Sequence, residues 1–307
     1  MNLENKKESV SLIILTFNEE KQIERCIKSA SEIADQVFII DSFSTDQTIR
    51  LAERLGAKVY QHEWEDNHAK QFNWGLDNLP IKTEWVFRLD ADEYLLPELV
   101  EEIKEKLPSL EKDITGVFLN RRVFFMNKWI KHGGYYPTYL LRLWRYGSGK
   151  FEERWMDEHV KLELGRTITF ENDFVDDNLN NLTWWINKHN NYSTREAVDL
   201  LNIKFKFSNR LSIDASISKD QDKRKRWLKE NLYSHIPLFL RPFFYFIYRY
   251  FFRLGFLDGK PGLIWHFLQG FWYRFLVDAK VYDIERRAKE ENKTITEVIK
   301  ENYGIEL

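Results

Sequence analysis

The feature that most constrains the fold is an alternation of short apolar segments with segments of helical spacing over about the first ninety residues. Each apolar segment is bounded by polar residues and suits a strand that is buried on both faces. In the intervening segments apolar side chains recur at helical intervals, as at Ile23, Cys26 and Ile27. The alternation predicts parallel strands with right-handed crossovers, and therefore an open α/β sheet with flanking helices. The predicted strands are residues 10–16, 37–40, 57–61 and 85–89, and the predicted helices are residues 19–33, 47–55 and 67–78.

Polar side chains cluster where these strands end, and ligands of open α/β sheets bind beyond the carboxyl ends of the strands. In extended backbone, residues two apart point the same way, so the carboxylates of Asp90 and Asp92 would aim at one point. A divalent cation that keeps substrate phosphates as ligands needs only one or two protein carboxylates. The pair therefore predicts a metal–diphosphate site, and the alternative is an Asp-rich turn that caps the next helix. The polar residues after the first, second and fourth strands are Thr16, Asn18, Glu19, Asp41, Asp90 and Asp92.

Composition narrows the classes of protein that remain. The formal net charge is −2 over 307 residues, which argues against a general nucleic-acid-binding surface, so we expect no nucleic-acid partner. Cys26 is the single cysteine, and it permits neither an intramolecular disulfide nor a cysteine-rich metal site. Residues 1–9 are polar and lack an apolar signal core, so we expect a cytoplasmic protein.

The pattern changes after about residue 115. Residues 116–124 and 138–144 predict longer strands, residues 167–170 a further strand, and residues 180–202 a helix. We expect a catalytic domain of residues 1–215 followed by a helical, membrane-associating region of residues 216–307.

Aromatic residues concentrate after about residue 235. Arginines interrupt residues 235–257, so no apolar span of about 20 residues remains for a transmembrane helix. Residues 263–282 carry a polar stripe and an aromatic stripe, and the two segments predict amphipathic helices that lie in the plane of a membrane, with basic residues 223–226 and Lys229 on anionic headgroups. The alternatives are a helical subdomain packed on the catalytic domain and a dimer interface. The polar stripe is His266, Gly270, Arg274 and Asp278, and the aromatic stripe is Leu263, Phe267, Phe271 and Phe275.

Residues 12–19, 39–48 and 89–93 resemble the family 2 glycosyltransferases in order and spacing. Residues 151–159 and the aromatic tail are similar to a bacterial branch that builds lipopolysaccharide cores and other surface polysaccharides. The resemblance implies the GT-A fold, a Rossmann-like and mostly parallel sheet, here with an amphipathic helical extension. It also implies an inverting, hexosyltransferase-type transfer from a nucleotide-sugar donor, assisted by Mg²⁺ or Mn²⁺. The implied acceptor is a lipid-linked or lipopolysaccharide glycan, reached by a peripheral protein on the inner face of the cell membrane.

The resemblance also implies roles for single residues. Asp41 matches the acidic residue that bonds the base, and Lys70 falls in a segment beside the diphosphate. Asp92 would contact the metal most directly, and Asp90 would contact ribose or the metal. Two alternatives stay open, because Asn18 or Glu19 would also serve as a cap of the first helix and Lys70 as a solvated surface lysine. The residues matched to the nucleotide by the first loop are Thr16, Asn18 and Glu19.

An inverting transfer needs a base opposite the departing diphosphate, because the acceptor hydroxyl must lose its proton as the new bond forms. The family places its catalytic carboxylate after the second run of strands, where this chain has Asp157, Glu158 and His159. We expect Glu158 or Asp157 to be the base, with Glu158 slightly favoured. The alternative is an exposed acidic turn beside Arg154.

Two other functions compete with a glycosyltransferase. A sugar nucleotidyltransferase has a related sheet, but it usually carries a glycine- and lysine-rich phosphate loop after the first strand, where this chain has Thr16-Phe17-Asn18-Glu19-Glu20. A non-catalytic, membrane-associated scaffold of the same fold is the other alternative, and it would tolerate the loss of Asp92.

Overall fold

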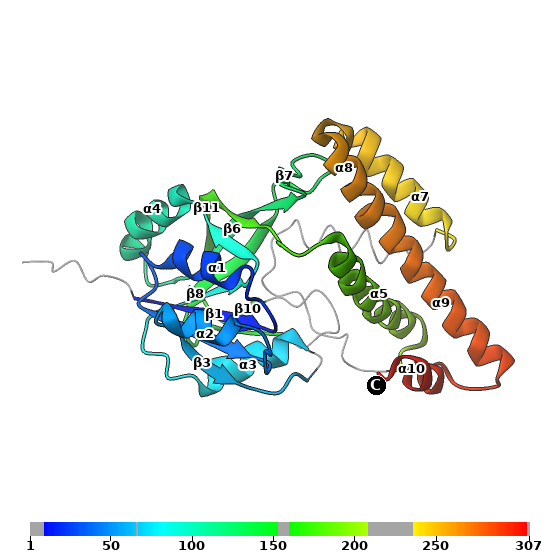
Figure 1. The fold of residues 1–307 in the computed structure, drawn as a ribbon, viewed down its shortest axis with the longest axis horizontal. Coiled ribbons are helices and arrows are strands. Elements are labelled where there is room, and N and C mark those ends of the chain that lie inside the picture. The colour runs from blue at the N-terminus through cyan, green and yellow to red at the C-terminus, as the bar shows by residue number, and fades with distance from the viewer. Residues whose placement is uncertain (1–8, 66, 153–159, 208–235, 306–307) are drawn as a thin grey trace, which may run out of the picture. The chain divides into compact units, whose positions relative to one another are not determined.

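The computed structural model describes residues 9–65, 67–152, 160–207 and 236–305. These residues form two compact units (Figure 1). The sheet unit contains the described residues up to 131 together with residues 135–152 and 160–179. The helical unit contains residues 132–134 and the described residues from 180 onward. The expected domain boundary after residue 215 falls outside the described residues and stays a prediction.

A nine-stranded sheet in the order β3-β2-β1-β4-β8-β6-β11-β5, with β7 beside β6, forms the centre of the sheet unit. The strands β3, β2, β1 and β4 are mutually parallel, as the alternation predicted, whereas β8 runs antiparallel to both β4 and β6. The short strands β9 and β10 pair separately. The bounds are β1 (Val10–Thr16), β2 (Gln36–Asp41), β3 (Lys58–Gln61), β4 (Trp85–Asp90), β5 (Glu93–Leu95), β6 (Ile114–Phe125), β7 (Lys128–Trp129), β8 (Tyr139–Arg145), β9 (Gly149–Phe151), β10 (Val160–Leu162) and β11 (Arg166–Asp176).

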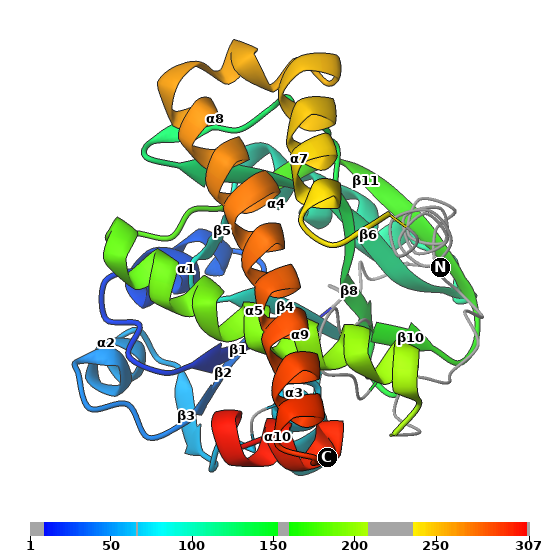
Figure 2. The same ribbon diagram turned by 90° about the vertical axis from the view of Figure 1, so that its right-hand side faces the viewer.

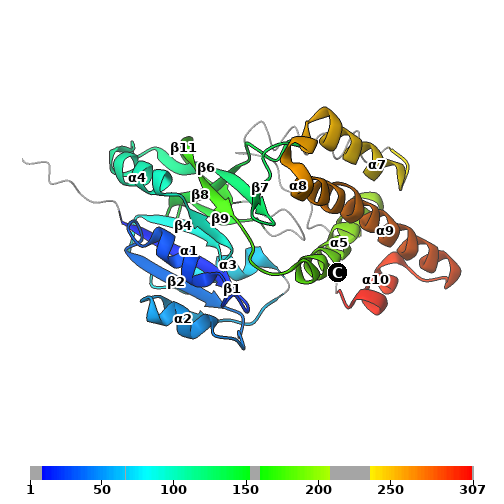
Figure 3. The same cartoon turned by 45° about the horizontal axis from the view of Figure 1, so that its top comes forward.

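Helices flank the sheet and create a core on each of its faces (Figure 3). Successive residues of β1 alternate between the two cores: Leu12 and Ile14 pack with α1 and α4, while Ile13 packs with α3. This double burial explains why the first four strands are nearly continuous apolar runs. The expected α/β fold is therefore confirmed. The helices of this unit are α1 (Ile23–Ala30), α2 (Thr48–Arg54), α3 (His68–Asn78), α4 (Pro97–Lys106) and the short η1 (Leu107–Ser109).

The helical unit is built around two long helices, α5 and α9, which pack against each other (Figure 2). Their contact is apolar, with Val198 and Leu201 of α5 meeting Val277 and Val281 of α9. None of the helices in the described parts of the chain is both long enough and apolar enough to cross a membrane. The elements are α5 (Leu182–Phe205), α7 (Leu240–Ile247), η4 (Tyr248–Phe252), η5 (Gly255–Asp258), α8 (Gly259–Trp265), η6 (His266–Trp272), α9 (Tyr273–Glu290) and α10 (Ile295–Tyr303).

The two stripes expected in residues 263–282 differ sharply in burial. The polar stripe is turned inward, since His266 is fully buried and Asp278 is nearly so. The aromatic stripe is turned outward, with Phe267 and Phe275 exposed. The helical extension expected from the sequence is thus present, and among the described residues its aromatic stripe is exposed while its polar stripe is turned inward.

Candidate functional site

The loops that follow β1 and β2 are joined to each other by hydrogen bonds. The backbone N–H of Asn18 donates to Ser44 Oγ at 2.8 Å, and the side-chain oxygen of Asn18 accepts from the N–H of Thr45 at 2.8 Å. The N–H of Glu19 donates to Thr48 Oγ1 at 2.7 Å. Asn18 takes a left-handed backbone conformation with φ 57°, which asparagine tolerates better than most residues. The N-cap position of α1 belongs to Gln22, so Asn18 and Glu19 link two loops and do not cap this helix.

Asp41 is fully buried at the end of β2 and fixes the loop that follows. Its carboxylate accepts hydrogen bonds from Thr16 Oγ1 at 2.7 Å and from the backbone N–H of Ser44 at 2.8 Å. The hydroxyl of Ser44 donates to the same carboxylate at 2.5 Å. Thr16 and Asp41, which the sequence assigned to nucleotide binding, are therefore in direct contact and hold Ser44 in the position that supports Asn18.

Two exposed phenylalanines project from these loops, and sequence reasoning did not single them out. Phe17 is 59% exposed and Phe43 is 50% exposed. Phe43 also has φ 59°, a conformation that bulky side chains rarely adopt and that needs support from the surrounding structure. The sequence did carry a signal: Phe17 directly follows Thr16 at the end of the first strand, and Phe43 lies two residues after Asp41 at the end of the second. The loops thus place two flat apolar rings at the carboxyl edge of the sheet.

Asp90, the last residue of β4, lies between two guanidinium groups. Arg88 Nε donates to Asp90 Oδ1 at 3.1 Å, and a terminal nitrogen of Arg142 donates to Asp90 Oδ2 at 3.2 Å. Burial favours the neutral acid, but the charges of Arg88 and Arg142 outweigh it and hold the pKa of Asp90 well below its ordinary range. Asp90 is therefore an anion whose charge is already balanced by the protein.

Arg142 and Glu93 complete this group and were not foreseen as a pair. Arg142 is 4% exposed and reaches the site because β8 runs antiparallel beside β4. It donates to Glu93, whose other oxygen accepts from the backbone N–H of Asp90 at 2.9 Å. Burial, together with the carboxylates of Asp90 and Asp176, raises the pKa of Glu93 to about 8 against the opposing charge of Arg142. Glu93 thus positions the backbone of the acidic motif and shares its arginine with Asp90.

Asp92 has different surroundings from Asp90. The strand ends at Asp90, and Ala91 and Asp92 form a turn, so the alternation that was to aim both carboxylates at one point does not extend to Asp92. Asp92 accepts from Asn178 Nδ2 at 2.9 Å, and its backbone oxygen accepts from the N–H of Asp177 at 3.0 Å. The Asp92 carboxylate thus has a neutral amide as its hydrogen-bond donor, whereas the Asp90 carboxylate has two guanidinium cations.

This chemistry fits a divalent cation at Asp92 better than at Asp90. Within the described residues, no three His, Cys, Asp or Glu side chains form a ready metal cluster. A cation that also binds a substrate diphosphate needs only one or two protein carboxylates. The Asp92 carboxylate accepts from a neutral amide, and the nearby guanidinium of Arg25 donates to the Asp92 backbone oxygen and to Asp177, whereas the Asp90 carboxylate itself pairs with Arg88 and Arg142.

Lys70 lies in the first turn of α3, and its ammonium pairs with Glu65 at 2.8 Å. The neighbouring His68 contributes a charge that lowers the pKa of Asp90, so the start of α3 belongs to the same sheet edge. Gln71 connects the loops after β2 and β3, since it donates to Ser42 Oγ at 3.1 Å and contacts His62 Nδ1 at 2.7 Å. The two base candidates, Asp157 and Glu158, lie outside the described residues, so their role stays a prediction.

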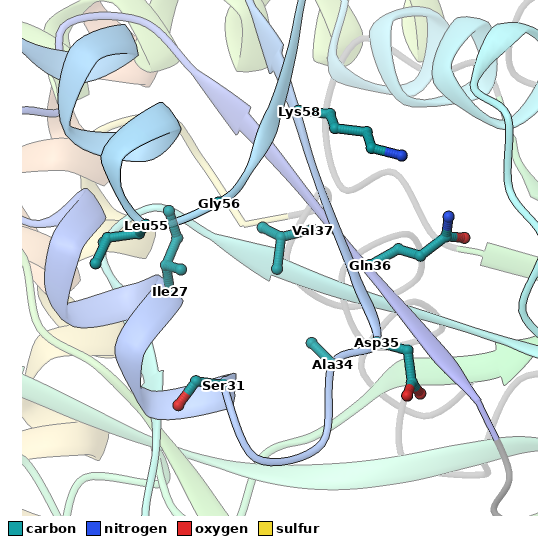
Figure 4. A pocket seen from close by; sticks show the side chains of 9 residues that line it. All are labelled: Ile27, Ser31, Ala34, Asp35, Gln36, Val37, Leu55, Gly56 and Lys58. Carbon is teal, nitrogen blue, oxygen red and sulfur yellow. The ribbon is translucent and has the colours of Figure 1, made fainter.

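A small cavity is present at the other edge of the sheet (Figure 4). It is lined by residues at the start of β2 and β3, among them Gln36 and Lys58, and by Ser31 after α1. Asp41 ends β2, whereas Gln36 begins it, so the cavity and the acidic motif lie at opposite ends of the strands. None of the residues predicted for the site lines this cavity.

Comparisons with known proteins find similarity to glycosyltransferases. The family described as Glycosyl transferase family 2 matches residues 11–177, more than half of the chain. Over 291 residues the chain is 28% identical to the lipopolysaccharide core biosynthesis glycosyltransferase LpsC of Rhizobium meliloti, covering 89% of this chain and 92% of that protein. Over 104 residues it is 39% identical to an uncharacterized glycosyltransferase of Rickettsia bellii, a match that spans 34% of each protein.

The chain thus spans about a third of the length of the Rickettsia relatives that it matches. Among solved structures, it is similar to glucosyl-3-phosphoglycerate synthase from Mycobacterium tuberculosis, determined with Mn²⁺, uridine diphosphate and glucosyl-3-phosphoglycerate. That similarity has 22% identity and a TM-score of 0.32, and it covers 38% of this chain and 44% of the synthase.

Proposed function

The chain belongs to glycosyl transferase family 2, and from this premise we propose that it moves a hexose from a nucleotide-sugar donor to a lipid-linked or lipopolysaccharide-core glycan with inversion. The similarity to LpsC along most of both chains supports this class of acceptor. The observation that carries the proposal is the acidic motif at the end of β4, which shares one sheet edge with the linked loops after β1 and β2. This is the edge at which open α/β sheets bind ligands.

The donor nucleotide would lie on the loops after β1 and β2. The contacts among Thr16, Asn18 and Asp41 set the shape of these loops, and Glu19 ties the first loop to Thr48. The exposed ring of Phe17 or Phe43 would support a face of the base, since stacking on an aromatic side chain suits any base. Asp41 would bond the base edge after the loop around Ser44 adjusts.

The donor diphosphate would lie beside Asp92, held by an Mg²⁺ or Mn²⁺ ion that this carboxylate binds together with phosphate oxygens. Such an ion stabilises the charge that develops on the departing diphosphate. Asp90 would contact the ribose or the ion. Lys70 would leave Glu65 and pair with a phosphate, because a surface ion pair of this kind contributes little stability and exchanges readily.

The acceptor hydroxyl would attack the anomeric carbon from the face opposite the diphosphate. The new carbon–oxygen bond forms as the bond to the diphosphate oxygen breaks, and the hydroxyl proton passes to a carboxylate base. We assign this base to Glu158 or Asp157, with Glu158 slightly favoured, on the resemblance of residues 151–159 to the family's catalytic segment.

We further propose that the protein works as a peripheral protein at the inner face of the cell membrane, where a lipid-linked acceptor is available. The aromatic and basic composition of the chain after residue 220 supports this location.

The experiment is a thermal-shift screen of nucleotide diphosphate sugars with and without Mn²⁺, followed by assays of donor hydrolysis and transfer. A donor that binds the native state raises the melting temperature. Asp92→Asn is expected to remove the Mn²⁺-dependent shift and to lower transfer by at least about a hundredfold, because charge stabilisation by the metal is worth several kcal/mol. The matched control Asp77→Asn, an exposed carboxylate paired with Lys150, should behave like the parent protein. Normal turnover by Asp92→Asn would refute the metal assignment, whereas a parent protein that neither hydrolyses nor transfers any donor would favour a scaffold.

Glu158→Gln and Asp157→Asn test the base separately. The variant that lacks the base should lose turnover by about 10²–10⁴-fold while its donor-induced thermal shift is retained, since a general base acts on the acceptor and not on donor binding. If both single variants turn over normally, the base lies elsewhere.

A further inference from the structure

We propose that the helical unit inserts a continuous aromatic face, built from α7, η4, η5, α8, η6 and the start of α9, into the headgroup region of an anionic phospholipid bilayer. The inference rests on the proposed membrane location and gives it a surface, an orientation and a lipid class. We call this surface the aromatic face and define it by the exposed side chains Leu240, Phe243, Phe244, Tyr248, Phe251, Phe252, Leu254, Phe256, Leu257, Leu263, Phe267 and Phe275.

The aromatic face is continuous, which scattered surface residues are not. Its members are between 39% and 76% exposed, with Phe252 the most exposed. The rings form a chain of neighbours whose centroids lie 5.1–6.5 Å apart. Monomeric soluble proteins seldom expose a large contiguous apolar surface, and those that do use it for binding. Half-buried rings link members of the face: Phe271 joins Phe275 to Phe267, and Phe246 contacts Phe267 and stacks on Tyr250, which contacts Phe251 and Phe256.

The polar side chains of the same segment are bound inside the helical unit. Arg241 and Asp278 form a buried ion pair, and Asp278 also accepts from the N–H of Phe239 at 2.8 Å. Arg249 Nε donates to the backbone oxygen of Gly133 at 2.6 Å. If α7 rotated to cover its aromatic side, the buried carboxylate of Asp278 would lose its cation, which is costly.

Further polar contacts hold the turn between α7 and α8. Asp258, which is 2% exposed, accepts from the N–H of His132 at 2.9 Å and contacts the ring of His132 at 2.6 Å. His266 lies against the same carboxylate and is fully buried. The turn that carries Phe256 and Leu257 is thus anchored from within, and its apolar side chains point away from the anchor.

The exposed charged residues of this segment indicate which partner the aromatic face binds. Residues 236–272 contain a single acid, Asp258, and it is buried. The exposed charged residues of the same stretch, Arg253 and Lys260, are cationic. An anionic headgroup layer complements aromatic side chains with a cationic rim, and each basic residue near such a surface contributes on the order of 1 kcal/mol. In a twofold dimer, the aromatic face would instead meet the same face of a second copy, which has no exposed acid in residues 236–272 to pair with Arg253 and Lys260.

The test is flotation of the full chain with two kinds of vesicle. One is phosphatidylcholine alone, and the other also contains about 30% phosphatidylglycerol, which gives it an anionic surface. The protein is expected to float with both kinds of vesicle and more completely with the anionic ones. The variant Phe251→Ser/Phe252→Ser/Phe267→Ser should bind anionic vesicles about a hundredfold more weakly, since it removes three exposed rings that the bilayer would bury. Arg253→Glu/Lys260→Glu should lose the preference for anionic vesicles and keep the binding to neutral ones.

A matched control removes exposed apolar side chains elsewhere: Met126→Ser/Leu164→Ser/Phe205→Ser should float like the parent protein. Circular dichroism must show the same helix content in each variant, and exposed positions make this the expected result. Equal flotation of the aromatic-face variant and the parent would overturn the proposal. A parent protein that does not bind vesicles would also overturn it. If light scattering then shows a dimer that the same three substitutions convert to a monomer, the face is a dimer interface.

The flotation requires no donor, so its outcome is independent of catalysis. Protein that ignores vesicles but shows an Mn²⁺-dependent thermal shift with a donor would leave the glycosyltransferase proposal intact and remove this one. Protein that binds vesicles through the aromatic face but never binds a donor would do the reverse.

Discussion

In the sheet unit, apolar side chains cover both faces of the sheet, and Asp41 and Asp90 lie at the carboxyl ends of β2 and β4. In the helical unit, the segment from residue 236 to residue 278 has the Arg241–Asp278 ion pair inside and the aromatic face outside. The first arrangement is what water requires of a compact domain. The second is stable in water only because the buried charges are paired, and it leaves an apolar surface that needs another environment. The contrast teaches that the amphipathic pattern alone does not say which side of a helix faces inward.

The two units also use buried arginine differently. Arg142 of β8 serves two carboxylates at the edge of the sheet, Asp90 and Glu93, so its role is tied to the candidate site. Arg241 pairs with Asp278 far from that site in the chain, and the pair joins α7 to α9. The same residue type therefore positions the acidic motif in one unit and joins two helices in the other.

The largest expected effect on this contrast comes from removing one partner of the Arg241–Asp278 pair. Arg241→Met leaves the carboxylate of Asp278, which is 1% exposed, without its cation and should lower the free energy of unfolding of the helical unit by about 3–5 kcal/mol. Arg241→Met/Asp278→Leu replaces both charges by apolar groups and should restore most of that loss. Urea unfolding followed by tryptophan fluorescence measures both. If the double variant is as unstable as the single one, the ion pair contributes more than charge compensation and the comparison has to be revised.

A second prediction separates the units by the pH dependence of stability. Burial, aided by Arg249 and His132 and opposed by Asp258, lowers the pKa of His266 from 6.5 to about 4. Between these values the unfolded chain binds a proton that the folded unit does not, so stability is full above pH 6.5 and falls as the pH falls toward 4, by about 3 kcal/mol in total. His189 of α5, also with a pKa lowered to about 4 by burial, adds to the same trend.

Glu93 gives the sheet unit the opposite trend in metal-free buffer. Its pKa is raised from 4.5 to about 8, so the folded unit holds a proton that the unfolded chain releases, and stability falls as the pH rises through this window.

The His266 prediction is measured by unfolding the parent and His266→Gln at pH 7 and pH 4.5. The variant should lose less stability in acid than the parent, whereas equal losses would show that His266 is not the group that titrates.

The smallest expected effect is the difference in stability loss between Gly133→Ala and Gly147→Ala, which separates overpacking from backbone strain. Gly133 has φ +70°, and an added Cβ would lie 2.0 Å from Cε1 of the buried His266; Gly147 has φ +82° and no atom within 4 Å of such a Cβ. Gly147→Ala should therefore cost only the left-handed backbone term, about 1–2 kcal/mol. Gly133→Ala should exceed it by about 1–3 kcal/mol of overpacking. Equal losses in chemical denaturation would mean that the His132–Gly134 segment is not held tightly by the helical unit.

Sequence reasoning reached the parallel half of the sheet and the position of the polar clusters. Residues 10–16 were predicted as a strand and form β1 with the same bounds, because a run buried on both faces is legible from local composition. That Asp90 and Asp92 point together stays a prediction, and it no longer follows from strand alternation, because the strand ends at Asp90 and a turn follows. Arg142 was missed because its partners lie on β4 and β5, and the antiparallel pairing that brings them together is not a local property.

By itself, the sequence determined the alternation of strands and helices, the order of the polar clusters along one sheet edge and the amphipathic character of the C-terminal segments, since each depends on the spacing of neighbouring residues. Only the tertiary structure decided that Asp90 is neutralised by Arg88 and Arg142, and that the polar stripe of residues 266–278 faces inward. Both outcomes depend on groups from distant parts of the chain, Arg142 for Asp90 and Arg241 for Asp278, because a charge can be buried only where a partner meets it.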